Sequence, residues 1–247
     1  MPTYTLNGIV LRRKDFAEAD KILTLITREK GKIDVIARSA RKPGAKLASL
    51  TEGLAMSQFQ LAVGRTFDIV TQVVPIHSYL GLRSDLKRLS FALYWCELLD
   101  SLVHEGEPNE ALFELTEFVL TQLEHSPNPE IALRWGEFHL IGNLGYEPMV
   151  DVCAQCEKVP TGLWAGFSPS VGGLLCARCG AQTRDSLRIP LEALPEIRDL
   201  LRSDRPSDEI LQIGNIARIT RSFWRHLLGH DLKSAAFLDE LLSEPTR

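Results

Sequence analysis

The chain has little that would place it in a membrane or outside the cell. None of its apolar runs approaches the roughly 18 residues that a membrane-spanning helix needs. The first residues, Met1–Leu6, lack the charged and apolar regions of a secretory signal. Without an export signal, we expect its paired cysteines to hold a metal and not to form disulfides. We therefore expect a cytoplasmic protein with no membrane partner.

The familiar catalytic motifs are also missing. Gly31 and Lys32 do not form a phosphate-binding loop of the Walker A type, because the upstream glycine and the following serine or threonine are absent. No G-x-S-x-G, H-E-x-x-H or H-x-E…P-C-x-x-C sequence occurs. The six histidines show no recognisable spacing to a serine, cysteine or carboxylate. The sequence therefore predicts a protein that is not an enzyme.

Charge is unevenly distributed along the 247 residues, of which 45% are hydrophobic and 24% charged, as in an ordinary soluble protein. Residues 1–80 contain twelve Lys or Arg and seven Asp or Glu, which gives a local charge of +5. The rest of the chain carries a charge of −9. This asymmetry indicates an anionic partner for the N-terminal segment, with a chance fluctuation as the alternative.

Cysteine is scarce, but four of the five cysteines form two C-x₂-C pairs. The pairs are Cys153/Cys156 and Cys176/Cys179, with a separation typical of a structural zinc site. Four thiolates complete the tetrahedron around one Zn²⁺ and leave no position for water, so we expect the metal to be structural. Redox-active pairs or four unrelated thiols are the alternatives. Residues 151–180 contain two basic and two acidic side chains, so the module has no net charge to attract DNA.

The first 80 residues predict a small β-barrel. Short apolar-rich runs separated by turn residues indicate five strands, and apolar and polar side chains alternate most clearly in the third. Five short strands without a long helix among them favour an OB-fold, a five-stranded barrel whose outer face and loops bind nucleic acid. The predicted strands are Thr5–Leu11, Lys21–Thr27, Lys32–Arg38, Leu54–Val63 and Phe67–Val74.

Beyond residue 80 the apolar period changes from that of strands to that of helices. The predicted helices are Ser84–His104, Asn109–His125, Glu130–Leu144, Leu191–Leu201, Asp208–Leu228 and Lys233–Leu242. Together these patterns predict a multidomain α+β protein. Its N-terminal five-stranded OB-fold β-barrel occupies residues 1–80, an α-helical bundle domain occupies 81–150 and 181–247, and a zinc module with four cysteine ligands is embedded at 151–180.

Nine basic residues form the main candidate binding site. They fall on the elements that line the nucleic-acid groove of an OB-fold, namely strands two and three and the adjoining loops. Lysine and arginine there would neutralise phosphates, and the scarcity of aromatic residues nearby favours backbone binding over base stacking. A solvated basic surface is the alternative. The candidate DNA-binding residues are Arg12, Arg13, Lys14, Lys32, Arg38, Arg41, Lys42, Lys46 and Arg65.

A second basic stripe lies farther along the chain. Arg218, Arg221 and Arg225 share one face of a predicted helix, because residues three and four apart are neighbours on a helix surface. We expect a solvated helix face here, with a DNA contact as the alternative.

Several blocks of the sequence resemble the RecO family of bacterial recombination mediators. One runs GIVLRRKDFAEADKILTLITREKGKIDVIARSARKP, and a later one runs LRWGEFHLIGNLGYEPMVDVCAQC. The order and content of all the blocks together carry the likeness, and no single motif does. The C-terminal segment resembles the family only in being helical, and it contains no matching block of sequence. The blocks cover residues 8–43, 75–100, 105–120, 133–156 and 167–179.

The resemblance implies a function and a set of partners. Members of this family bind single- and double-stranded DNA and anneal complementary strands. With RecR, and sometimes RecF, they help to load RecA onto DNA coated by single-stranded-DNA-binding protein. A nucleoid-associated location in the cytoplasm follows, and the zinc would support the fold, since some members lack the cysteines. Two other interpretations stay open: an OB-plus-zinc scaffold for RNA or for proteins of transcription or translation, and a zinc hydrolase or nuclease.

Overall fold

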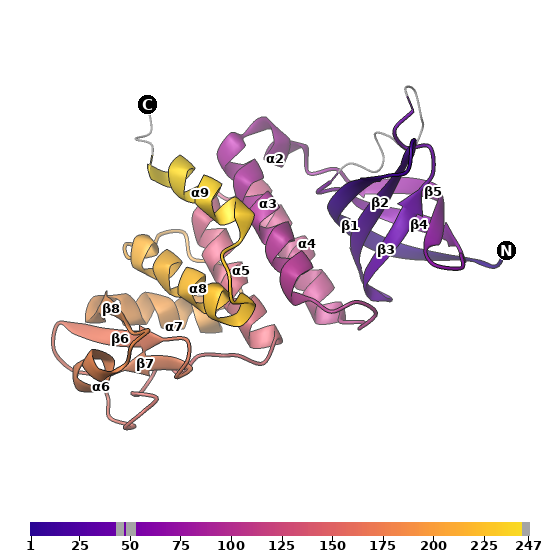
Figure 1. The fold of residues 1–247 in the computed structure, drawn as a ribbon. Helices are drawn as coiled ribbons and strands as arrows, with labels where there is room; N and C mark the ends of the chain where they lie inside the picture. The colour runs from indigo at the N-terminus through magenta and orange to yellow at the C-terminus, as the bar shows by residue number, and fades with distance from the viewer. Residues whose placement is uncertain (43–46, 48–52, 244–247) are drawn as a thin grey trace. The chain divides into compact units, whose positions relative to one another are not determined.

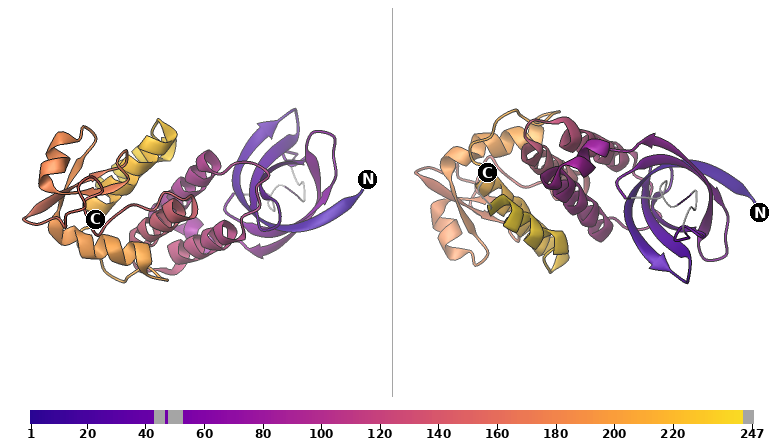
Figure 2. Two further views of the ribbon diagram at one scale, coloured as in Figure 1. Left: turned by 90° about the horizontal axis from the view of Figure 1, so that it is seen from below. Right: turned by 90° about the horizontal axis from the view of Figure 1, so that it is seen from above.

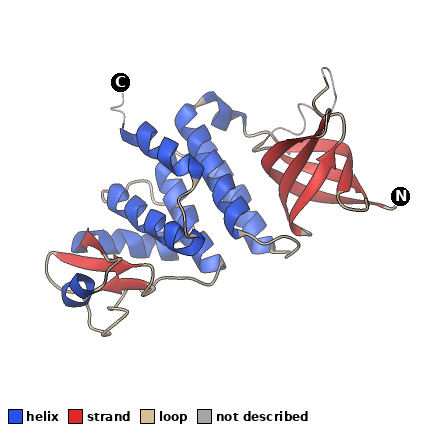
Figure 3. Cartoon of the chain, in the orientation of Figure 1, coloured by secondary structure: helices blue, strands red, loops and turns tan. Residues whose placement is uncertain are grey.

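The computed structural model describes residues 1–42, 47 and 53–243. These residues form two compact units, which we call unit 1 (Met1–His125 with the chain from Leu232 onward) and unit 2 (Ser126–Asp231). Strands occur in both: a barrel in unit 1 and a small sheet in unit 2 (Figure 3). The division into units does not follow the expected boundaries at residues 80, 150 and 180, which stay a prediction.

Unit 1 begins with a closed barrel of five strands (Figures 1 and 2). The strand order around the barrel is β1-β2-β3-β5-β4, and β3 and β5 are parallel while the other neighbours are antiparallel. The predicted five-stranded sheet is thus confirmed, and its closure leaves no edge strand unpaired. The strands are β1 (Thr3–Phe16), β2 (Asp20–Thr27), β3 (Gly31–Ala37), β4 (Met56–Ala62) and β5 (Asp68–His77).

The strand register explains how so few strands can close. A path from partner to partner around the barrel leaves β1 at Thr3 and returns to the same strand at Lys14. This stagger tilts the strands strongly, so that the interior is just wide enough for side chains to fill. The most buried inward side chains are Leu6, Val10, Leu23, Leu25, Val35, Phe59 and Leu61.

Strand β1 is longer than predicted, because it continues through the polar stretch 12–16. These residues pair with β2 as far as Phe16 opposite Asp20, after an irregularity between Val10 and Arg12. All five are exposed, so they show none of the apolar alternation by which a half-buried strand is recognised. The prediction of a loop after the first strand is therefore wrong, and Arg12, Arg13 and Lys14 lie on a strand.

Four helices complete the described part of unit 1. Helix α3 begins after Asp85, whose side chain accepts a hydrogen bond from the backbone N–H of Arg88 at 3.0 Å. Helix α9 packs on α3, where the Glu97 carboxylate accepts hydrogen bonds from the first amides of α9. None of the described helices of the chain is long and apolar enough to cross a membrane. The helices of unit 1 are α2 (Leu80–Ser84), α3 (Leu86–Leu102), α4 (Glu110–His125) and α9 (Lys233–Ser243).

The segment between α3 and α4 lies against the start of β3. The backbone N–H of Gly106 donates to the Lys32 carbonyl at 2.9 Å, and Lys32 and Glu105 form an isolated β-bridge. Gly31 has φ of +66°, and a Cβ at this position would lie 2.0 Å from the carbonyl oxygen of Glu107. Only glycine combines this backbone angle with such a close approach. The start of β3 is therefore covered by the chain itself.

Unit 2 contains a three-stranded antiparallel sheet with the order β7-β6-β8. The sequence did not predict these strands, which are short and rich in glycine. Because β8 follows the expected end of the zinc module at residue 180, the sheet extends beyond that boundary. The elements are β6 (Trp164–Ser168), β7 (Gly173–Leu175), α6 (Ala177–Gln182), β8 (Leu187–Pro190) and the 3₁₀ turn η1 (Leu191–Ala193).

Three longer helices complete unit 2: α5 (Pro129–Asn143), α7 (Leu194–Arg202) and α8 (Ile213–Leu228). Helix α8 starts later than the predicted Asp208. The amides of Leu211 and Gln212 donate to the Glu196 carboxylate at 3.0 and 2.9 Å, which holds the chain before Ile213 in a turn. Helices α5 and α8 share a buried charge network.

Glu137 on α5 is fully buried in unit 2. Its carboxylate accepts hydrogen bonds from Arg134 at 2.6 Å, from the Thr220 hydroxyl at 2.8 Å and from the Trp224 indole at 2.8 Å. A buried carboxylate is tolerated only when it is paired and hydrogen-bonded in this way. The network therefore fixes the register of α8 against α5.

Candidate nucleic-acid interface and metal centre

Two of the nine predicted DNA-binding residues contact α3. Lys32 is only 8% exposed, and its Nζ lies 2.6 Å from the Asp100 carbonyl oxygen and 3.7 Å from Asp100 Oδ1. Arg12 remains partly exposed, with its Nε 3.2 Å from Oδ2 of the same aspartate. The expectation that Lys32 projects from an exposed strand face is wrong, because α3 and the chain that follows it cover this face. Both cations attach the barrel to α3.

Five other predicted residues gather at the opposite end of β3. The backbone N–H of Ser39 donates to Asp20 at 2.8 Å, and that of Arg41 donates to the Ala19 carbonyl at 2.9 Å. The segment after β3 is thereby held against the turn between β1 and β2, next to the exposed end of β1. We call the resulting group the cationic rim, and it consists of Arg13, Lys14, Arg38, Arg41 and Lys42.

The cationic rim keeps most of its charge available to solvent. Arg41 lies 3.4 Å from Asp15 and donates to the Ala17 carbonyl at 3.2 Å, so its charge is partly used locally. Among the residues that the structure describes, the other four members of the rim form no ion pair, and all are exposed. The five cations of the rim outnumber the three carboxylates of the adjoining turn, Asp15, Glu18 and Asp20, so the surface keeps a net positive charge that a phosphate backbone can approach.

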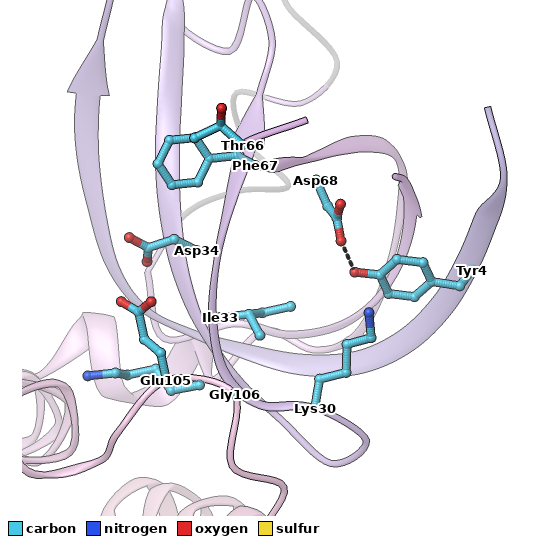
Figure 4. A pocket seen from close by; sticks show the side chains of 10 residues that line it. Tyr4, Lys30, Ile33, Asp34, Thr66, Phe67, Asp68, Glu105 and Gly106 are labelled. Carbon is cyan, nitrogen blue, oxygen red and sulfur yellow. Dashed lines mark hydrogen bonds between the residues drawn. The ribbon is translucent and has the colours of Figure 1, made fainter. Parts of the chain in front are cut away.

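The two remaining predicted residues do not join the rim. Lys46 lies outside the described residues. Arg65 is exposed in the turn between β4 and β5, where its neighbours Thr66 and Phe67 line a cavity of about 330 Å³. This cavity is at the covered end of β3 (Figure 4). The expected single groove with all nine cations is therefore not formed by the described residues.

The cavity beside Arg65 is acidic. Asp34, Asp68 and Glu105 line it, and the Tyr4 hydroxyl donates to Asp68 (Figure 4). Burial and this hydrogen bond raise the pKa of Tyr4. The Lys30 amine lies 3.7 Å from the centre of the Tyr4 ring and covers one face of it in a cation–π contact. Its three carboxylates outnumber the two lysines that also line it, Lys30 and Lys32, so this cavity does not extend the cationic rim.

A second cavity, of about 520 Å³, adjoins the rim. Its lining is mostly apolar, with leucines from β1, α3 and the chain before β4, and it also includes Arg12, Arg13 and Arg83. Arg83 on α2 donates to the Gly53 carbonyl at 2.9 Å. Sequence reasoning missed Arg83, because a lone arginine at the end of a short helix carries no signal. We call this cavity the arginine groove.

The four paired cysteines meet in unit 2. Their sulfur atoms all lie within 4.8 Å of one another, and Cys156 Sγ is 3.8 Å from Cys176 Sγ. A tetrahedral zinc with bonds of about 2.3 Å would place its sulfurs about 3.8 Å apart. Cys176 precedes α6, and its sulfur accepts a hydrogen bond from the Cys179 amide. The four cysteines that the C-x₂-C pairs predicted to meet therefore do so, and this donor set fits one Zn²⁺.

Within this close-packed group of sulfurs, the pKa values of the cysteines shift in opposite directions. Burial raises the pKa of Cys153, but backbone hydrogen bonds from Cys176, Gln155 and Cys156 outweigh it and bring the pKa to about 6. The hydrogen bond with Cys176 raises the pKa of Cys179 to about 12, and burial and the other sulfurs add to this. Four sulfurs this close cannot all ionise without a positive charge among them. A divalent cation held by the four sulfurs would supply that charge and would leave no open position for catalysis.

The second basic stripe on α8 is largely engaged in local bonds. Arg225 forms a two-pronged ion pair with Asp231, with N–O distances of 2.9 and 2.8 Å. Arg218 donates to Asn215 at 3.3 Å. These contacts favour the expected solvated helix face over a surface for DNA.

The fold and the two sites together define a class: an OB-like barrel with a cationic rim, joined to a helical region that carries a cluster of four cysteines. The family model described as Recombination protein O N terminal matches residues 1–79, and the one described as Recombination protein O C terminal matches residues 83–236. The chain belongs to the RecO family of DNA repair and recombination proteins, as the sequence blocks indicated.

Relatives from several bacteria are similar in sequence to this chain along almost its whole length. The DNA repair protein RecO of Symbiobacterium thermophilum is 36% identical over 98% of this chain and 99% of its own length. The protein of the same name from a Roseiflexus species is 36% identical over 96% of this chain and 86% of its own. The DNA repair protein RecO of Pelotomaculum thermopropionicum is 34% identical over 99% of this chain and 97% of its own length. The likeness therefore includes the C-terminal helices, which the sequence blocks did not cover.

Proposed function

We propose that the chain is a mediator of DNA repair and homologous recombination that has no catalytic activity of its own. It binds single- and double-stranded DNA, anneals complementary strands and, with RecR, helps to load RecA onto DNA coated by single-stranded-DNA-binding protein. RecF is a further partner, and the protein works in the cytoplasm, at the nucleoid. Membership of the RecO family supports the biological class, and the cationic rim supports the DNA contact.

The cationic rim is the observation that carries the DNA-binding part of this proposal. Its exposed cations neutralise phosphates without reading bases, because only one exposed aromatic side chain among the described residues, Phe16 at the end of β1, accompanies them, which is too little for an extended stacking platform. Annealing needs two backbones to be neutralised and brought close, after which base pairing supplies the free energy. Annealing makes and breaks no covalent bond, so it requires no catalytic group. A zinc ion enclosed by four sulfurs would hold the module together and would not act on DNA.

Charge reversal on the rim tests the proposal. Replacement of Arg38 and Lys42 by glutamate should weaken binding to DNA of any sequence and slow annealing, because the phosphates then meet negative charge. The matched control reverses two exposed arginines of unit 2, Arg205→Glu with Arg218→Glu, which changes the net charge equally. Normal annealing by the rim variant, or equal loss in the control, would contradict the assignment.

An RNA-binding scaffold is the alternative function, and a direct comparison separates the two. DNA and RNA strands of one sequence should be annealed in parallel, with and without single-stranded-DNA-binding protein. A DNA repair mediator accelerates the annealing of DNA coated by that protein and retains RecR in a pull-down. A clear preference for RNA without these two properties would favour the scaffold.

The arginine groove supports the proposed contact with single-stranded-DNA-binding protein. The tail of single-stranded-DNA-binding protein is acidic and hydrophobic, and the groove offers leucine side chains beside Arg13 and Arg83. Replacement of Leu93 by aspartate should therefore weaken binding of a tail peptide, because a carboxylate enters the apolar lining. Leu93 is exposed, so the fold should tolerate the change. An equal loss with Leu211→Asp, an exposed leucine of unit 2, would point to a nonspecific effect.

A further inference from the structure

Three side chains that commonly bind metals meet where β5 leads into the helices of unit 1. His77 is the last residue of β5, and Glu124 and His125 are the last two residues of α4. Nε2 of His77 lies 2.7 Å from Oε2 of Glu124, and Nε2 of His125 lies 3.4 Å from the same oxygen. One ligand atom from each of the three residues lies within 4.8 Å of the other two. The cysteine module is in the other unit and contributes nothing to this cluster.

The separations between the carboxylate oxygen and the two histidine nitrogens are those of ligands around one ion, and the ligand nitrogens of the two histidines lie within 4.8 Å of each other. Imidazole nitrogens and carboxylate oxygens bind Zn²⁺ at about 2.0–2.2 Å. At such bond lengths neighbouring ligands are about 3 Å apart in an octahedron and about 3.4 Å apart in a tetrahedron. The two observed separations, 2.7 and 3.4 Å, bracket these values. An ion can therefore enter with small movements of two exposed imidazole rings.

The carboxylate is already oriented for this role. The backbone N–H of Gly81 donates to Oε1 of Glu124 at 2.8 Å, which leaves Oε2 directed at the histidines. The Glu124 side chain is only 7% exposed, so its position is fixed by packing. His77 in turn packs edge-on against Tyr79, with the ring centres 4.3 Å apart. Such outer contacts orient metal ligands and strengthen binding.

The local field also favours a cation. The cluster lies at the C-terminal end of α4, where the carbonyl dipoles of the last turn are negative. Arg88 donates to the carbonyl oxygens of Leu123 and Glu124 and so takes up part of that potential. Within the described parts of the chain, however, no lysine or arginine pairs with the Glu124 carboxylate itself. The charge of that carboxylate is available to the histidines and to an ion between them.

We propose that His77, Glu124 and His125 form a second metal site, which takes a divalent first-row transition ion such as Zn²⁺. Two imidazoles and one carboxylate are a donor set that suits zinc, with water in the remaining positions. The ion joins the end of the last barrel strand to the end of α4. It thereby stabilises unit 1 in the way that the cysteine-bound ion stabilises unit 2.

A zinc titration of the full-length protein tests this proposal. The protein is first freed of weakly held metal with a mild chelator, so that the cysteine site keeps its ion. Zn²⁺ is then added in competition with a chromophoric chelator. We expect one further equivalent to bind and the melting temperature of the protein to rise. His125→Gln should lower the affinity of that equivalent at least about tenfold, because even the loss of an outer contact has that effect.

The variants separate a metal site from a hydrogen-bonded ion pair. His125 is 66% exposed, so its replacement should leave the metal-free melting temperature unchanged. His77→Gln should reproduce the loss of affinity, whereas His104→Gln, an exposed histidine outside the cluster, should bind the further equivalent normally. If the protein takes up no zinc beyond the cysteine-bound ion, or if His125→Gln binds it as tightly, the proposal is overturned.

Discussion

The barrel and the cysteine module are two small β structures that are stabilised in different ways. Every barrel strand has two neighbours, and apolar side chains from all five strands fill the interior. The module, residues 151–180, contributes β6 and β7 to a three-stranded sheet whose third strand, β8, follows it, and its own buried cluster includes Cys153, Leu175 and Cys179. Because the barrel is stabilised by its interior, its rim is available for charge. The module depends on its sulfur ligands, and it has no net charge to offer DNA.

Loss of one zinc ligand should separate the two structures most clearly. Cys176→Ser removes one of the four sulfur ligands. In zinc-finger peptides, the binding of a structural zinc contributes about 10–16 kcal/mol to folding. We expect the module to lose protection from hydrogen exchange and the yield to fall, while the barrel keeps its protection. DNA affinity at a temperature where unit 1 stays folded should be unchanged. A stable, metal-free variant that lost only DNA binding would instead make the module the DNA contact.

Removal of the buried ion pair in unit 2 should have the next largest effect on stability. Glu137→Ala removes the nearer of the two carboxylates that pair with buried Arg134, since Glu130 lies 3.8 Å away, and it also removes the acceptor of Thr220 and Trp224. Loss of one partner of a buried ion pair typically destabilises a protein by about 3–5 kcal/mol. Denaturant unfolding of the variant and of the double substitution Arg134→Met with Glu137→Leu measures this. The double variant should recover part of the loss, because it contains no buried arginine, although Thr220 and Trp224 lack their acceptor in both variants. If the single and double variants unfold alike, the ion pair is not the cause.

A smaller effect is expected where the barrel meets α3. Asp100→Ala removes the carboxylate shared by Arg12 and Lys32, and a hydrogen bond to a charged group contributes about 1.5–3 kcal/mol. Thermal unfolding should show this loss of stability. Arg12→Gln should lower DNA affinity less than Arg13→Gln, because the charge of Arg12 is already paired with Asp100. Equal effects of the two substitutions would show that pairing with α3 does not withdraw Arg12 from the DNA surface.

The smallest effect concerns pH and helix α9. Burial raises the pKa of Glu97, but hydrogen bonds from Ser234 and Lys233 outweigh it, so the pKa lies below its ordinary value of 4.5. The stability that this carboxylate contributes is present above pH 4.5 and is lost as the pH falls through the lowered pKa. Hydrogen exchange of α9 should therefore accelerate in that range in the wild-type protein. In Glu97→Gln it should be faster already at neutral pH and less dependent on acid.

Periodic elements were predictable from the sequence, because a single buried face leaves a local pattern. The alternation in Lys32–Arg38 placed β3, and the leucine spacing placed α3 and α4 within a few residues. The C-x₂-C spacing likewise predicted the cysteine cluster, since two knuckles with a turn-rich segment between them can reach one ion. These features depend on neighbours in the sequence, so a single chain is enough to find them.

The errors concern contacts between distant residues. The exposed end of β1 carries no apolar pattern, and nothing near Lys32 in the sequence reveals that the chain around Glu105 covers it. His77 and Glu124 meet only because β5 leads into α2 beside the end of α4, so their cluster has no sequence spacing to recognise. The division of the cations into the rim and the contact with Asp100 has the same origin. Charge alone cannot tell a cation used for packing from one left in solvent.

The salt dependence of DNA binding tests the role of the cationic rim most directly. Each phosphate neutralised on single-stranded DNA contributes about 0.7 to the slope of the logarithm of affinity against the logarithm of salt concentration. Replacement of both Arg13 and Lys14 by glutamine should therefore make the slope about 1.4 shallower and weaken binding at low salt. The same slope and affinity as in the wild-type protein would contradict the assignment of the rim as the DNA surface.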